Sequence, residues 1–140
     1  MAQNKLKVLI LDDEPIVCKR LKPSLEKLGF EVDTFTRSFE AMQAVEKSRY
    51  DIIVTDLKME GMDGMRFLQE AKKLYPETEV IVITGFATME TAKESFKKGV
   101  FDFIAKPFNL NEIQKVVQRA ADKIRGPLPI QLMPRVPARP

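Results

Sequence analysis

Five polar residues, each at or just after the end of a short apolar run, are the part of this sequence that could do chemistry. They are Asp12, Asp13, Asp56, Thr84 and Lys106. Mg²⁺ prefers oxygen ligands such as carboxylates, an ammonium neutralises anionic groups, and a hydroxyl can hydrogen-bond a phosphoryl oxygen. Two carboxylates about 4 Å apart repel each other by about 4 kcal/mol at an effective dielectric constant near 20, so three in one crevice require a cation. If the five side chains converge, they predict a site for a divalent metal ion and a phosphoryl group.

The apolar runs have the length and composition of buried β-strands. They span residues 6–11, 30–35, 52–55, 80–83 and 100–105, and a stretch with helical spacing follows each of them. Strands that alternate with helices predict an α/β fold with a doubly wound parallel sheet and right-handed crossovers. Open sheets of this kind bind ligands beyond the carboxyl ends of their strands. We therefore expect the polar residues to meet at that edge.

The helical stretches are expected over residues 14–28, 38–48, 65–74, 88–98 and 109–125. The last of them has the clearest start, with Asn109 as N-cap and Glu112 as its capping-box partner. The fourth has a thin apolar face, for which we expect Met89, Ala92 and Phe96 to point inward. Thin burial implies low local stability, so this helix is a candidate for movement.

Length, charge and cysteine content narrow the class of protein. The chain has 140 residues, of which 44% are hydrophobic and 31% charged, as expected for one globular domain. No stretch approaches the roughly 18 apolar residues of a membrane span. Cys18 is the single cysteine, so no internal disulfide forms and a cytoplasmic location is expected. The net charge of +3 comes in part from arginines near the C-terminus. The sequence has no stripe of basic residues with interleaved aromatics, so we do not expect the chain to bind nucleic acid.

The composition changes after Gly126. Five of the last 14 residues are proline, which is too dense for a helix or a central strand. We therefore expect residues 1–126 to form one domain and residues 127–140 to form a proline-rich tail that is disordered or in the polyproline II conformation.

With these residues in place, the chain resembles the receiver domain of two-component response regulators over nearly all of residues 5–125. The resemblance rests on the segments LILDDEP, VTDLKMEGMDG, VIVITG and FIAKPF, in this order and at this spacing. It implies a flavodoxin-like fold, in which five parallel strands are arranged in the order 2-1-3-4-5 and are covered by five helices. We expect a single-domain regulator with a proline-rich tail, and a receiver detached from a larger regulator stays open as the alternative.

The resemblance also implies a role for each acidic residue. Asp56 would be the phosphoacceptor, which takes a phosphoryl group from a histidine kinase in a reaction that depends on Mg²⁺. Asp13 and Asp56 would be direct metal ligands, with the backbone carbonyl of Lys58 as a third. Asp12 would act on the metal through water.

The remaining roles concern the phosphoryl group and the switch. By resemblance, Thr84 and Lys106 would contact the transferred group, Phe103 would swing inward when Thr84 turns, and the bond from Lys106 to Pro107 would be cis. The surface formed by the fourth helix, the fifth strand and the fifth helix would then change. Expected partners are a sensor histidine kinase or phosphotransfer protein, a downstream protein target and a second copy of the chain. No catalysis is expected beyond the chain's own phosphorylation and dephosphorylation.

Two alternatives stay open at this point. The chain could be a phosphorelay intermediate that passes its phosphoryl group on. It could also be a phosphatase of related fold, which would phosphorylate an aspartate too. Haloacid-dehalogenase phosphatases, however, place that nucleophile first in a D-x-D motif after the first strand, where this chain has Asp12, Asp13 and Glu14.

Overall fold

The computed structural model describes residues 5–57 and 64–126 of this chain. Strands and helices alternate along it as β1 (Lys7–Leu11), α1 (Pro15–Glu26), β2 (Glu31–Phe35), α2 (Ser38–Lys47), β3 (Ile52–Asp56), α3 (Gly64–Leu74), β4 (Glu79–Thr84), α4 (Met89–Lys97), β5 (Asp102–Ala105) and α5 (Leu110–Arg125). The predicted tail, residues 127–140, and Lys58 lie outside the described residues.

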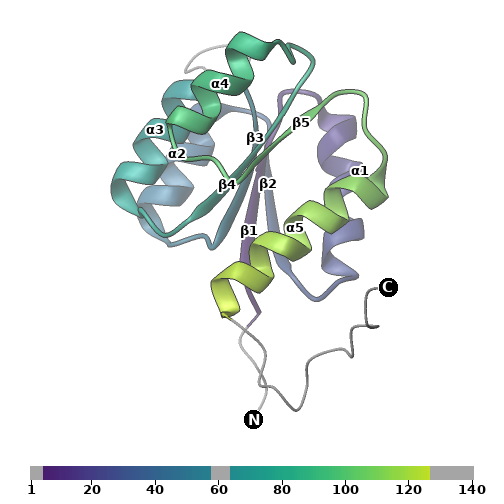
Figure 1. The fold of residues 1–140 in the computed structure, drawn as a ribbon. Coiled ribbons are helices and arrows are strands. Elements are labelled where there is room, and N and C mark those ends of the chain that lie inside the picture. Colours follow the sequence, from purple (N-terminus) through teal and green to yellow (C-terminus); the bar gives the residue numbers. More distant parts are fainter. Residues whose placement is uncertain (1–4, 58–63, 127–140) are drawn as a thin grey trace, which may run out of the picture.

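The five strands form one parallel sheet in the order β2-β1-β3-β4-β5, which confirms the predicted flavodoxin-like fold (Figure 1). The strands are in register at their carboxyl ends. Leu11 of β1 pairs with Phe35 on one side and with Thr55 on the other. Thr84 of β4 pairs with Ala105 of β5. The residues that follow β1, β3, β4 and β5 therefore emerge at one edge of the sheet.

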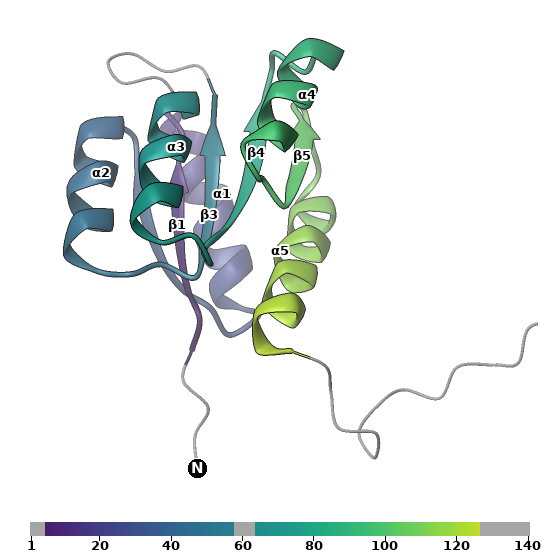
Figure 2. The same cartoon turned by 60° about the vertical axis from the view of Figure 1, so that its left-hand side comes forward.

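Helices cover both faces of the sheet, so its strands alternate between two cores. Val8 and Ile10 of β1 pack in the core formed with α1 and α5, whereas Leu9 and Leu11 pack in the core formed with α2 and α3. Successive side chains of a strand point to opposite faces, and a sheet buried on both sides needs apolar residues at every position. This explains why the strands read as continuous apolar runs. Figure 2 shows α2 and α3 on one side of the sheet, with α1 behind it.

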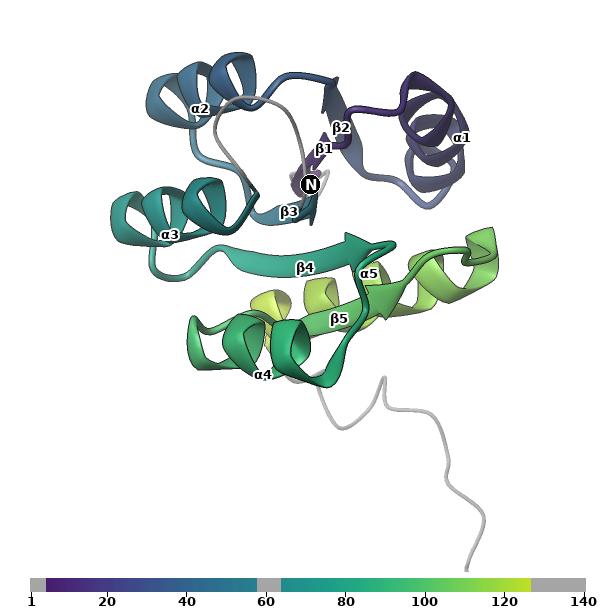
Figure 3. The same cartoon turned by 90° about the horizontal axis from the view of Figure 1, so that it is seen from above.

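Helix α4 lies beside the edge strand β5 (Figure 3) and corrects one prediction from the sequence. The expected inward face is wrong, because Met89 is 75% exposed and Phe96 is 50% exposed. The residue that α4 buries is Ser95, whose hydroxyl donates a hydrogen bond to the carbonyl oxygen of Thr91 at 2.8 Å. The small side chain, with its hydroxyl satisfied inside the helix, can face the protein. The helix therefore buries even less apolar surface than its sequence indicated.

The helix starts match their local signals in part. Asn109 caps α5 as predicted, with its Oδ1 accepting from the Glu112 N–H at 2.8 Å. The full reciprocal capping box is found instead at α4, between Thr88 and Thr91. Across the described ranges, no helix is both long and apolar enough to cross a membrane.

Candidate functional site

The five polar residues singled out from the sequence converge at the carboxyl edge of the sheet. Asp12 and Asp13 follow β1, Asp56 ends β3, Thr84 ends β4 and Lys106 follows β5. The carboxylates of Asp12, Asp13 and Asp56 each offer an oxygen that lies within 4.8 Å of the others. The strand order therefore brings together residues that are up to 94 positions apart in the sequence.

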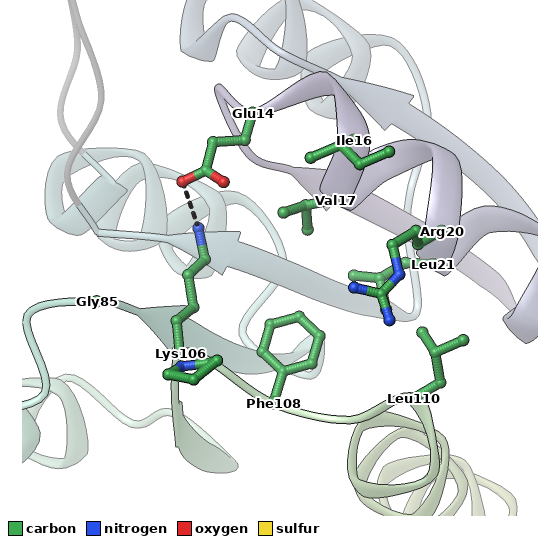
Figure 4. Close-up of a pocket in the computed structure, with 10 residues that line it drawn as sticks. Glu14, Ile16, Val17, Arg20, Leu21, Gly85, Lys106, Phe108 and Leu110 are labelled. Atoms are coloured by element: carbon green, nitrogen blue, oxygen red, sulfur yellow. Dashed lines mark ion pairs between the residues drawn. The ribbon is translucent and has the colours of Figure 1, made fainter.

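Lys106 is the cation of this cluster. Its Nζ lies 2.7 Å from Asp12 Oδ2, 3.0 Å from Asp56 Oδ2 and 3.6 Å from Glu14 Oε1; the last contact is drawn in Figure 4. Burial by itself lowers the pKa of Lys106, but its close contacts with the carboxylates of Asp12 and Asp56 outweigh burial and raise the pKa above its ordinary value. The ammonium is thus charged and holds the acidic residues together.

Asp12 is the most buried of the acids, with none of its surface exposed. Its Oδ1 accepts a hydrogen bond from the backbone N–H of Glu14 at 2.9 Å. Its Oδ2 forms the ion pair with Lys106 but accepts no well-aligned hydrogen bond from any described residue. Burial raises the pKa of Asp12, and the contact with Lys106 opposes this only in part. This carboxylate is therefore short of partners that stabilise its charge.

The donor set fits a hard divalent cation. Asp12, Asp13 and Asp56 supply oxygen ligands only, and Asp13 is exposed, so its carboxylate is accessible from solvent. Histidine ligands would favour zinc or another transition metal, and the sequence contains no histidine. Mg²⁺ binds to such sites through one or two carboxylates and keeps several waters. The third ligand expected by resemblance, the carbonyl of Lys58, lies outside the described residues.

Asp56 is held from two directions. Its Oδ1 accepts a hydrogen bond from the backbone N–H of Leu57 at 2.7 Å, and its Oδ2 contacts Lys106 Nζ at 3.0 Å. The residue is 6% exposed, so little of it is open to solvent. A carboxylate with fixed orientation beside a cation is suited to attack an electrophile that enters the crevice.

Thr84 and Phe103 lie on the neighbouring strands β4 and β5. The Thr84 hydroxyl is buried and accepts a hydrogen bond from the Phe86 N–H at 3.0 Å, while the Thr84 carbonyl accepts from the Lys106 N–H at 2.8 Å. Phe103 is partly buried against the core formed with α2 and α3. The peptide bond between Lys106 and Pro107 is cis.

A pocket of about 400 Å³ opens beside Lys106, between α1 and the start of α5 (Figure 4). Its lining is largely apolar and includes Ile16, Val17, Leu21, Phe108 and Leu110. The acidic crevice is therefore flanked by an apolar surface on the side of α1.

The sequence does not predict the contacts that two residues make at this site. The sequence predicts Glu14 only as the start of a helix, yet its carboxylate faces Lys106. Gly64 was part of a recognised segment, but nothing in the sequence indicated that it packs directly against the backbone of Asp56. Glu14 and Lys106 are 92 positions apart in the sequence, and the Gly64 contact depends on where α3 begins relative to the end of β3. Neither contact has a local sequence pattern.

Comparisons with known proteins agree with this geometry. Residues 8–118 match the sequence profile described as "Response regulator receiver domain". The chain is 35% identical over 114 residues to the regulatory protein AtoC of Escherichia coli strain K12, covering 81% of this chain and 25% of AtoC. It is 30% identical over 120 residues to the transcriptional regulatory protein ZraR of Salmonella typhimurium, covering 86% of this chain and 27% of ZraR. The chain thus spans about a quarter of the length of these relatives.

Solved structures show the same architecture. A response regulator receiver domain protein from Clostridium thermocellum superposes with a TM-score of 0.79 at 30% identity, covering 86% of this chain and 97% of that one. A response regulator protein from Burkholderia pseudomallei superposes with a TM-score of 0.76 at 26% identity, covering 86% of this chain and 71% of that one. The latter crystal structure contains a phosphorylated aspartic acid, a calcium ion and citrate.

Proposed function

This chain belongs to the response regulator receiver domain family, and from that premise we propose that it is a phosphorylation-activated switch with Asp56 as its phosphoacceptor. The observation that carries the proposal is the position of the Asp56 carboxylate, which lies within 4.8 Å of the Asp12 and Asp13 oxygens and 3.0 Å from Lys106 Nζ. A related response regulator structure contains both a phosphorylated aspartic acid and a calcium ion. The same chemistry is supported here by the residues themselves.

The proposed reaction transfers a phosphoryl group from a phosphohistidine to Asp56. A carboxylate oxygen forms a new bond to phosphorus, the bond from phosphorus to the donor nitrogen breaks, and that nitrogen keeps the electron pair. The product is an acyl phosphate on Asp56. The donor is a sensor histidine kinase or a phosphotransfer protein.

The surrounding residues supply charge and orientation. Asp13 and Asp56 would hold Mg²⁺ directly, with Asp12 acting through water, and the ion would offset repulsion between the carboxylates and the phosphoryl oxygens. Lys106 already contacts Asp56, so its ammonium is placed to pair with an oxygen of the transferred group. The Thr84 hydroxyl would donate a hydrogen bond to another of those oxygens.

The switch would act through the surface formed by α4, β5 and α5. We infer that turning the Thr84 hydroxyl toward the phosphoryl group, with Phe103 moving inward, changes this surface and so controls binding to a downstream protein or to a second copy of the chain. The acidic cluster would serve only the chain's own phosphorylation and dephosphorylation, with no reaction on another substrate. A cytoplasmic location fits the proposed kinase partner.

The test is to label the protein with a small phosphodonor in the presence of Mg²⁺ and to measure its intact mass. Wild type should gain one phosphate that hydroxylamine removes, as expected for an acyl phosphate. Asp56→Asn should gain none, whereas the control Asp122→Asn, which removes the same charge from α5, should be labelled like wild type. Full labelling of Asp56→Asn would show that the phosphoacceptor is another residue.

A further inference from the structure

The peptide group between Asp56 and Leu57 is held at both of its polar ends. On one side, the N–H of Leu57 donates a hydrogen bond to Asp56 Oδ1 at 2.7 Å. On the other side, the carbonyl oxygen of Asp56 accepts from the hydroxyl of Thr55 at 2.9 Å and lies against the Cα of Gly64. One planar unit thus connects the first residue of α3 to the carboxylate of the phosphoacceptor.

Only glycine fits at position 64. A Cβ there would overlap the carbonyl oxygen of Asp56 and would lie 2.7 Å from both the carbonyl carbon of Asp56 and the Cα of Leu57. All three are backbone atoms, so no side-chain rotation could relieve the overlap. The Gly64 N–H also donates to the Leu57 carbonyl at 2.9 Å, which keeps the start of α3 against this peptide. A larger residue would have to displace the peptide or break that bond.

We propose that Gly64 is a positioning residue for phosphoryl transfer, because it sets the orientation of the Asp56–Leu57 peptide and thereby aims the Asp56 carboxylate. The inference rests on the function proposed above for Asp56. The peptide bond is planar, so pushing on its carbonyl oxygen also moves its N–H. That N–H is the donor to Asp56 Oδ1. Its displacement turns the carboxylate away from Lys106 and from the carboxylate oxygens of Asp12 and Asp13.

The experiment compares Gly64→Ala with wild type and with Val117→Ala. The control truncates a buried residue of α5 in the core on the α1 side of the sheet, so it matches a loss of stability without touching this peptide. In ¹H–¹⁵N NMR spectra of the metal-free proteins, a charge-assisted hydrogen bond shifts the Leu57 amide proton downfield. Gly64→Ala should move that proton upfield, while Val117→Ala should leave it in place.

Phosphorylation of the same variants gives the second readout. Gly64→Ala should be labelled at Asp56 about a hundredfold more slowly than wild type, the loss typical of a reacting group displaced by about 1 Å. Val117→Ala should be labelled at nearly the wild-type rate at a temperature where it is folded. A folded Gly64→Ala protein with an unmoved Leu57 proton and a wild-type labelling rate would overturn the proposal.

Thr55→Val keeps the test decisive if Gly64→Ala does not fold. It removes the hydroxyl that holds the same carbonyl oxygen and keeps the shape of the side chain. It should shift the Leu57 proton in the same direction and slow labelling by a smaller factor, and no change in either would contradict the inference. Failure of wild type itself to become labelled at Asp56 would refute the proposed function, whereas the NMR result depends only on the peptide geometry.

Discussion

The buried hydroxyl of Thr84 accepts a hydrogen bond from the backbone N–H of Phe86 at 3.0 Å. The carbonyl oxygen of Phe86 in turn accepts from the hydroxyl of Thr91 at 2.6 Å. Thr91 lies in the first turn of α4 and also accepts from the N–H of the N-cap residue Thr88 at 3.1 Å. The backbone of Phe86 therefore connects the end of β4 to the start of the least buried helix. A turn of the Thr84 hydroxyl toward a phosphoryl group would be transmitted along this connection.

Replacing Thr91 should uncouple α4 from Asp56. Thr91→Val keeps the branched shape but removes the hydroxyl, so Asp56 should still be phosphorylated while the response of α4 weakens. Contacts of a phosphoryl group to Thr84 and Lys106 contribute about 1.5 to 3 kcal/mol each, against about 5.5 kcal/mol for reversing a 1:99 population. The free energy from these two contacts is therefore barely enough to reverse the population, so losing the connection through Thr91 should weaken the response of α4.

The measurement is hydrogen exchange across residues 86–97, with and without beryllofluoride as a phosphoryl mimic. Wild type should show a change on addition of the mimic, and Thr84→Ala and Thr91→Val should show a smaller one. Thr88→Ser, which retains a hydroxyl at the N-cap, serves as the control. A full response in Thr91→Val would contradict the coupling.

Divalent metal should stabilise the protein through the acidic cluster. At a Mg²⁺ concentration one hundred times its Kd, binding to the folded state adds about 2.7 kcal/mol to the free energy of unfolding. Thermal melts with Mg²⁺ and with a chelator would measure the difference in Tm. Asp13→Ala should reduce the Mg²⁺ effect more than Asp12→Ala, since Asp12 is expected to reach the metal through water. Equal melting temperatures of wild type with and without Mg²⁺ would show that the cluster does not hold the ion.

Tyr50 should make the protein less stable in strongly alkaline solution. Burial first, and then the hydrogen bond from its hydroxyl to Asp33 Oδ2 at 2.7 Å, raise the pKa of Tyr50 from 10.0 to about 12. A group whose pKa is higher in the folded state contributes its full stability below the unfolded pKa and loses it as the pH rises through the folded one. The contribution of Tyr50 is therefore lost between about pH 10 and pH 12.

Urea unfolding at pH 9 and pH 11 would test this in wild type and Tyr50→Phe. The phenylalanine variant lacks the titrating hydroxyl, so its stability should fall less between the two values. Absorbance at 295 nm should report the tyrosinate of Tyr50 in wild type near pH 12. A titration of Tyr50 in the folded protein at its ordinary pKa would refute the prediction.

Removing residues 127–140 should have little effect on the domain. Helix α5 ends at Arg125, and its buried residues, from Ile113 to Ala121, all precede that end. A protein that stops at Gly126 should therefore melt within a few degrees of the full chain and be phosphorylated at Asp56 equally well. A large drop in Tm would mean that the final residues contribute to the core.

Residue patterns alone were enough to predict the strands and helices and to single out the polar residues that follow the strands. Buried strands and capped helices have local patterns, because side-chain periodicity and helix-end hydrogen bonds involve residues close together in the chain. The strand order came from a resemblance to the receiver family and was confirmed by the pairing of β1 with both β2 and β3. Polar residues after the strands could then be placed at one edge.

How those residues are held could be learned only from the folded chain. The contact of Gly64 with the backbone of Asp56 and the ion pair of Glu14 with Lys106 join segments whose approach depends on helix packing. The outward position of Met89 on α4 likewise depends on which side of the helix meets the sheet. Such distances arise from backbones that pack across the whole domain, and residue types and spacing carry no local signal for them.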